Sequence, residues 1–190
     1  MITRLLAPVA TAWFLASVAG PAPASAQTAA QHLALASDST FLQTVGSFAL
    51  LQVKLGKLAQ QKGSSDVVRD FGKRMATEYA QTNEQLSAGA KQAAYPKPVL
   101  LRQHQQVFDR FNSMGKSSFD KSYMAEMVSE HDEAARLVEQ EAKEGRIASL
   151  KQLAAGMLSD VQQRQSLATQ AAGSVGADVT ATTSAERQGS

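Results

Sequence analysis

Apolar residues recur along most of this chain at the three- and four-residue spacing of amphipathic helices, and no segment shows the sustained alternation of a strand. The first such segment follows the polar residues 37–39 and runs to Lys62, where Gly63 and two serines interrupt it. The second starts from those serines and stops before Pro96 and Pro98, because a proline pair cannot continue a helix. The pattern therefore predicts two long helices in the first half of the chain.

The second half repeats this arrangement after a short helical piece over about residues 99–112. Ser117 and Asp120 have the spacing of a capping box, which predicts the start of a third long helix. Gly145 is its expected end. A fourth helix is expected from Ile147 to about residue 172, beyond which the chain loses its apolar stripe.

Four long helices with one long crossover predict an all-α fold, a ferritin-like antiparallel four-helix bundle whose crossover carries a short extra helix. The alternative, a coiled-coil rod, fits less well because the stripes are interrupted. The bundle domain is expected over residues 38–172. Residues 27–37 are interpreted as a linker, and residues 173–190 as a disordered tail because they are rich in Gly, Ala, Thr and Ser.

The N-terminus has the three parts of a secretory signal. Arg4 precedes an apolar stretch over residues 5–20, and Ala24 and Ala26 form a small-x-small cleavage site. Residues 1–26 are therefore interpreted as a signal peptide cleaved after Ala26. Together with the absence of Cys, this predicts a periplasmic protein. The alternative is membrane association through an uncleaved signal.

Charge and motifs narrow the function further. The chain has 19 basic and 17 acidic residues and lacks the basic stripe of a nucleic-acid binder. It contains no Cys, no Gly-x-Ser-x-Gly motif and no Gly-rich phosphate loop, so nucleophilic catalysis is not expected. No Glu-x-x-His motif of a di-iron centre occurs either. The protein is therefore interpreted as a non-enzyme.

Two stretches carry a family signature. Residues 53–59 read V-K-L-G-K-L-A, and residues 119–131 read F-D-K-S-Y-M-A-E-M-V-S-E-H. With their surroundings over residues 41–75 and 119–145, they resemble the bacterial domain-of-unknown-function family 4142. The resemblance implies an exported ferritin-like helical bundle, and it implies no settled biochemical activity.

The chain departs from this family pattern at three places. Lys54 stands where relatives carry Glu, and Tyr79 and Arg164 stand where they carry His. Other positions of the pattern are kept, namely Glu84, His131 and Glu141. If relatives bind metal at these places, this chain retains about half of the ligands, so no cofactor is expected. The alternative is a single Zn or Cu ion held by His131, Glu84 and Glu141.

The substituted residues suggest a central charge cluster of Lys54, Tyr79 and Arg164. In this hypothesis both cations face the bundle centre and neutralise Glu84 and Glu141 in place of a metal. The alternative is that both side chains reach solvent.

Two histidines also allow more than one interpretation. His131 is interpreted as a partly buried histidine that is hydrogen-bonded to a neighbouring helix. The alternative is a pH-responsive switch, in which the acidic neighbours raise the pKa of His131. His104 is interpreted as a solvated residue of the crossover.

The leading interpretation of function is an exported helical bundle that acts by binding, in envelope stress or as the partner of another exported protein. The alternative from another class is a ferritin-like metal protein. A third possibility, a membrane-surface protein, is disfavoured by the lack of a face rich in Lys and Arg.

Overall fold

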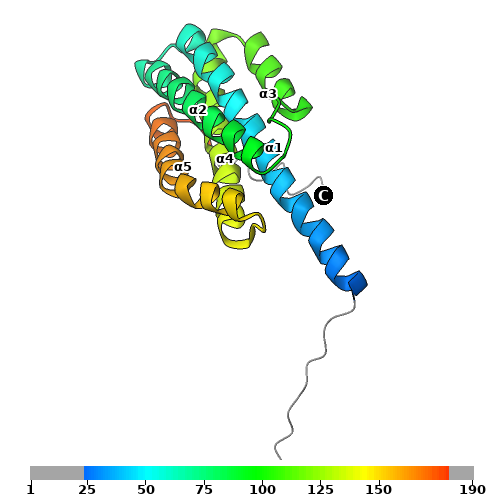
Figure 1. The fold of residues 1–190 in the computed structure, drawn as a ribbon. Coiled ribbons are helices and arrows are strands. Elements are labelled where there is room, and N and C mark those ends of the chain that lie inside the picture. Colours follow the sequence, from blue (N-terminus) through cyan, green and yellow to red (C-terminus); the bar gives the residue numbers. More distant parts are fainter. Residues whose placement is uncertain (1–23, 180–190) are drawn as a thin grey trace, which may run out of the picture.

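The computed structural model describes residues 24–179, with side chains from residue 37 onward, and over this range the chain is all-helical (Figure 1). Helix α1 spans Ala24–Lys62, α2 spans Asp66–Gln92 and α3 spans Arg102–Ser113. Helix α4 spans Lys116–Glu144 and α5 spans Ala148–Ser174. Most of the expected signal peptide lies outside the described residues.

Two boundaries differ from the prediction. Helix α1 begins at Ala24, so residues 27–37 are helical and do not form a linker, and in Figure 1 this part of α1 extends beyond the other helices. At the other end, α5 continues to Ser174. Val175, Ala177 and Val179 then pack, partly buried, against the core. Residues 173–179 are therefore not a disordered tail, and residues 180–190 lie outside the described range.

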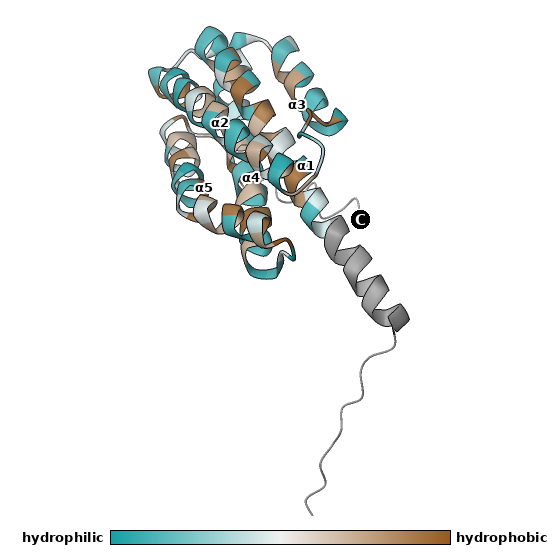
Figure 2. Cartoon of the chain, viewed as in Figure 1, coloured by the Kyte–Doolittle hydropathy of each residue, from teal (hydrophilic) through white to brown (hydrophobic). Residues whose placement is uncertain are grey.

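The four long helices contact one another in four pairs: α1 with α2, α4 with α5, α1 with α4, and α2 with α5. Cross-helix contacts show that each pair is antiparallel. Phe48 meets His131, and Asp38 meets Glu141, so the residue number rises along α1 as it falls along α4. Figure 2 shows hydrophilic residues on the outward faces of α2, α3 and α5, as expected for amphipathic helices around one core.

The hairpins α1–α2 and α4–α5 repeat one pattern. Asp120 follows Asp38 by 82 positions, and Gly145 follows Gly63 by the same number. The same offset relates buried positions of α2 and α5. The α2 positions are Val68, Gly72, Met75, Tyr79, Thr82 and Leu86, and their α5 counterparts are Leu150, Ala154, Met157, Val161, Arg164 and Ala168. The two hairpins therefore bury equivalent faces.

Each hairpin turn is held by an aspartate of the other hairpin. The Asp38 carboxylate accepts hydrogen bonds from the Arg146 and Ile147 amides, at 3.0 and 2.9 Å. The Asp120 carboxylate accepts from the Ser64 and Ser65 amides, at 3.0 and 2.7 Å. Because these amides lie between two helices and lack intrahelical partners, the two clamps satisfy them.

The clamp corrects the capping box predicted for Ser117 and Asp120. Helix α4 begins at Lys116 with Gly115 as its N-cap, and no side chain caps it. The expectation that Ser65 caps α2 is confirmed, since its Oγ accepts from the Val67 amide at 3.2 Å. Gly145 does end α4.

Helix α3 lies over α1 and is fixed to it along its length (Figure 1). At its start, the Ser47 hydroxyl accepts from the Leu101 amide at 2.7 Å. At its end, the Lys62 ammonium donates to the carbonyl oxygens of Phe111 and Met114, at 3.2 and 2.9 Å. A cation at this place satisfies the free carbonyls of a helix C-terminus.

Candidate functional site

The interior between the long helices is aromatic around His131. The His131 ring is fully buried and meets the rings of Phe48 and Tyr79 edge to face, with centroids 5.3 and 5.7 Å away. Phe71 lies 6.2 Å from it on the α2 side. This environment has the geometry of aromatic packing, in which the edge of one ring meets the face of the next.

The hydrogen bonding of His131 fixes its tautomer. Its Nδ1–H donates to the Met127 carbonyl oxygen one turn earlier on α4, at 2.7 Å. The Nε2 atom then carries the lone pair, and it has no hydrogen-bond partner among the described residues. Burial lowers the pKa of His131 to about 4; the Met127 bond opposes the shift and the nearby Arg164 charge adds to it. The predicted rise in pKa is therefore wrong, because the ring points into the core, away from solvent.

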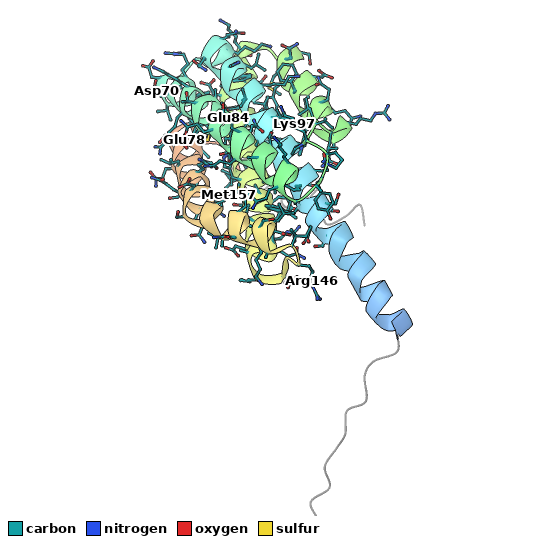
Figure 3. All side chains as sticks on the ribbon, viewed as in Figure 1. Asp70, Glu78, Glu84, Lys97, Arg146 and Met157 are labelled. Atoms are coloured by element: carbon teal, nitrogen blue, oxygen red, sulfur yellow. The ribbon has the colours of Figure 1, made fainter. Side chains whose placement is uncertain are left out.

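Arg164 of α5 crosses the same interior toward α2. Its Nε donates to Glu78 at 2.8 Å, and its Nη1 to the Thr82 hydroxyl at 3.4 Å. The guanidinium stands over the Tyr79 ring, 4.8 Å from its centroid. Arg164 is only 8% exposed, so the predicted position of this cation inside the helical core is correct, but its partner is Glu78 and not Glu84 or Glu141. Figure 3 shows Glu78 on α2 near α5.

Burial and the Arg164 charge have opposite effects on the pKa values of Glu78 and Tyr79. Burial alone would raise the pKa of Glu78, but the bonds and charges of Arg164 and Arg74 outweigh burial, and the net shift is downward. For Tyr79, burial dominates and raises the pKa, while Arg164 opposes it. At neutral pH the site therefore holds an arginine–glutamate ion pair beside a neutral tyrosine and a neutral histidine.

Lys54 does not belong to this interior. Its ammonium donates to the Gln105 side chain of α3 at 3.0 Å and lies 4.2 Å from the centre of the Phe108 ring. The predicted central cluster of Lys54, Tyr79 and Arg164 is thus divided: Tyr79 and Arg164 are in contact, whereas Lys54 secures the crossover helix.

The residues suggested as metal ligands are not brought together. Glu84 is exposed on α2, whereas His131 is fully buried on α4. Glu141 lies ten residues beyond His131 on the same helix, which corresponds to about 15 Å. In the part of the chain that the structure describes, no three His, Asp or Glu side chains are grouped as a metal site. The donor set proposed for Zn or Cu does not fit.

Glu141 of α4 and Asp38 of α1 form a second buried polar group, separate from the one around Arg164. The Glu141 side chain is hydrogen-bonded to Asp38, and both residues are buried, at 2% and 0% exposed. Burial first, and then the charge and hydrogen bond of Asp38, raise the pKa of Glu141 to about 7, with Lys151 opposing. This pair lies at the α4–α5 turn, at the end of the molecule where α1 extends outward.

A third polar group involves His104, which the sequence interpretation placed in solvent. His104 is only 6% exposed, and its Nδ1 is hydrogen-bonded to the Ser47 hydroxyl at 2.6 Å. Its Nε2 faces Glu130 at 3.7 Å. Burial lowers the pKa of His104. The order Ser–His–Glu resembles a nucleophilic triad, but Ser47 is fully buried and its oxygen already accepts the Leu101 amide. The group therefore anchors α3.

Surface hollows of a size suited to a ligand or peptide lie along the seam between α2 and α5. One groove of about 390 Å³ is lined by Gln85, Gln92 and six further residues, among them Leu153 and Met157. A second, of about 330 Å³, lies toward the other end of the seam and is lined by Val67, Phe71, Leu167 and five more residues. The opposite seam, between α1 and α4, is covered by α3 through Arg110, which pairs with Glu126 at 2.7 Å.

None of the described helices is long and apolar enough to cross a membrane. No curated protein and no solved structure matches the chain significantly. The family model of the domain of unknown function DUF4142 matches residues 22–171, which include all of α1, α2, α3 and α4 and nearly all of α5. The match covers most of the chain and confirms the resemblance drawn from residues 41–75 and 119–145: the protein belongs to the DUF4142 family.

Proposed function

We propose that this chain is an exported periplasmic protein, not an enzyme, that acts by binding a partner of the cell envelope. Its four long helices form a ferritin-like four-helix bundle in which the central site has been converted from ion binding to side-chain packing. The antiparallel contacts around the four helices and the long crossover between α2 and α4 support this assignment of the fold.

The observation that carries the proposal is the Arg164–Glu78 ion pair beside Tyr79 and His131. In a metal-binding bundle, carboxylates and imidazoles from facing helices converge on the ion. In this protein the Arg164 guanidinium lies where such ligands would converge, and its fixed positive charge repels a cation. The interior therefore supports a role in stabilising the fold and leaves the surface as the place of function.

The grooves along the α2–α5 seam support a binding role. They combine polar side chains such as Gln85 and Asp160 with apolar ones such as Leu153 and Val67. Binding surfaces commonly have this mixture of an apolar centre and polar groups that fix orientation.

The test begins with elemental analysis and thermal unfolding of the mature protein, purified from periplasm without chelator or affinity tag. We expect substoichiometric Zn, Cu, Mn and Fe, and no rise in Tm when each ion is added at 100 µM, which is on the order of 100 times a micromolar Kd. One bound ion per chain, or a saturable rise in Tm of several degrees, would overturn the proposal and return the protein to the metal-binding class.

Binding is tested in the cell with a photo-crosslinking residue at Gln85, inside one groove, and a matched control at the exposed Asp109 of α3. A discrete adduct with one envelope protein from position 85 alone is the expected result. Equal labelling from both positions would contradict a binding surface along this seam.

A further inference from the structure

The two aspartate clamps differ in the number of carboxyl groups that they contain. Glu141 lies beside the Asp38 clamp, and the equivalent position beside the Asp120 clamp, 82 residues earlier, is Ala59. The clamp at the α1–α2 turn therefore contains one carboxylate, and the clamp at the α4–α5 turn contains two carboxyl groups in contact.

The surroundings of Glu141 leave it little freedom. Its Oε1 has no hydrogen-bond partner among the described residues, and a Cβ built on Gly145 would lie only 2.5 Å from that oxygen. From the neighbouring elements, the crossover presents Tyr95, whose pKa is raised by burial and by the charges of Asp38 and Glu141. Helix α5 presents Lys151, whose positive charge opposes the rise in the pKa of Glu141. The Lys151 ammonium donates to the Lys143 carbonyl oxygen at 2.7 Å and is thereby held at the turn.

We propose that Asp38 and Glu141 form a pH-sensitive latch, which holds the α4–α5 turn against α1 while the pair shares a proton and loosens when that proton leaves. With one proton present, Glu141 donates to Asp38, and Asp38 remains the acceptor for the Arg146 and Ile147 amides. Without it, two negative carboxylates meet in a buried place, where their repulsion is screened little.

The weakest part of this arrangement is the turn. Asp38 is fixed on a long helix, as is Glu141, whereas residues 145–147 are bound to Asp38 only through two amide hydrogen bonds. Repulsion is therefore relieved most easily when the turn moves away from α1. Burial and the Asp38 charge place the pKa of Glu141 near 7, so the change falls close to neutral pH. Figure 3 labels Arg146 at this end of the molecule, where α1 extends outward.

The experiment is amide hydrogen exchange by NMR on the full mature chain at pH 5.5 and pH 8.5, corrected for intrinsic exchange rates. We expect the protection factors of Arg146 and Ile147 to fall about 10-fold or more over this interval. A pKa shift of about one unit or more corresponds to a change of this size in the equilibrium between the closed and the open turn. The Ser64 and Ser65 amides, at the clamp with Ala59, are the internal control and should keep their protection.

Glu141→Gln keeps the shape of the side chain and its ability to donate to Asp38, but it cannot ionise. In this variant the Arg146 and Ile147 protection factors should be independent of pH, whereas Glu84→Gln, at an exposed site, should behave as the wild type does. Loss of protection that is equal at both clamps, or that persists in Glu141→Gln, would overturn the latch. Should the Gln variant fail to fold, a wild-type titration without any difference between the clamps would overturn it alone.

Discussion

Arg164 and Lys54 were both predicted to face the centre of the molecule, but the fold places them in different surroundings. Arg164 bonds to Glu78 and Thr82 and covers the Tyr79 ring, and it is almost completely buried. Lys54 bonds to one amide of α3 and covers one ring at the surface. The stability of the protein should therefore depend on the first cation far more than on the second.

Arg164→Ala is predicted to lower the free energy of unfolding by about 2–3 kcal/mol, because it removes the charge-assisted bond to Glu78 and the cation over the buried Tyr79 ring, although Glu78 keeps its bond to Arg74. Lys54→Ala should lower it by no more than about 1 kcal/mol, the usual contribution of an accessible cation over a ring. Urea unfolding of both variants, with the exposed Lys57→Ala as control, measures the difference. Similar losses for Arg164→Ala and Lys57→Ala would contradict a structural role for the ion pair.

Sequence reasoning singled out Lys54, Tyr79 and Arg164, and the structure brings only Tyr79 and Arg164 together. The apolar stripe of α2 predicts that Tyr79 is buried, and it is. The partner of Arg164 could not be predicted. Whether Glu78 or Glu84 faces α5 depends on how α2 is rotated about its own axis, and the sequence pattern does not fix that rotation. Ser47 and His104 were missed because their contact joins positions 57 residues apart, through a crossover without a fixed spacing.

At the scale of helices, α1 and α2 approach each other closely at two glycines. A Cβ on Gly56 would lie 2.4 Å from the Gly72 carbonyl oxygen and 2.9 Å from the Ala76 amide nitrogen. Both atoms belong to the backbone of α2 and cannot move aside as a side chain would. The two helices can approach this closely only because both positions are glycine.

Gly56→Ala is accordingly predicted to destabilise the fold by about 2 kcal/mol, since overpacking must separate the two helices. Gly156 provides the matched control on α5, because nothing lies within 4 Å of its added Cβ. There the same substitution should stabilise the protein by about 0.5–1 kcal/mol through helix propensity alone. Thermal unfolding of the two variants should give Tm shifts of opposite sign, and two shifts of the same sign would contradict the close contact.

Helix boundaries show which local signals were sufficient for prediction. Gly145 and Ser65 have a local role, and both were predicted correctly. Asp120 was assigned to a local cap but binds the amides of a turn 55 residues away. The start of α1 was also missed, because the polar residues 37–39 resemble a cap although Asp38 serves the distant α4–α5 turn.

For the molecule as a whole, two buried groups make stability depend on pH in opposite directions. The folded-state pKa of His131 is about 4, below its ordinary value of 6.5, so the unfolded chain binds more protons and stability is lost as pH falls from 6.5 toward 4. The folded-state pKa of Glu141 is about 7, above its ordinary value of 4.5. Its contribution is complete below pH 4.5 and is lost as pH rises toward 7.

The two shifts are similar in size and opposite in sign, so the two effects oppose each other in the wild type between pH 4.5 and 6.5. Variants that remove one of the two groups should reveal how the free energy of unfolding changes with pH because of the other. The free energy of unfolding of Glu141→Gln should rise with pH over this interval, and that of His131→Phe, which keeps an aromatic ring in the core, should fall. Urea unfolding at pH 4.5, 5.5 and 6.5 gives both slopes, with Glu84→Gln as the control. Parallel pH profiles for all three variants would mean that neither buried group governs the pH dependence, whereas slopes of opposite sign would show that two buried groups oppose each other in the wild type.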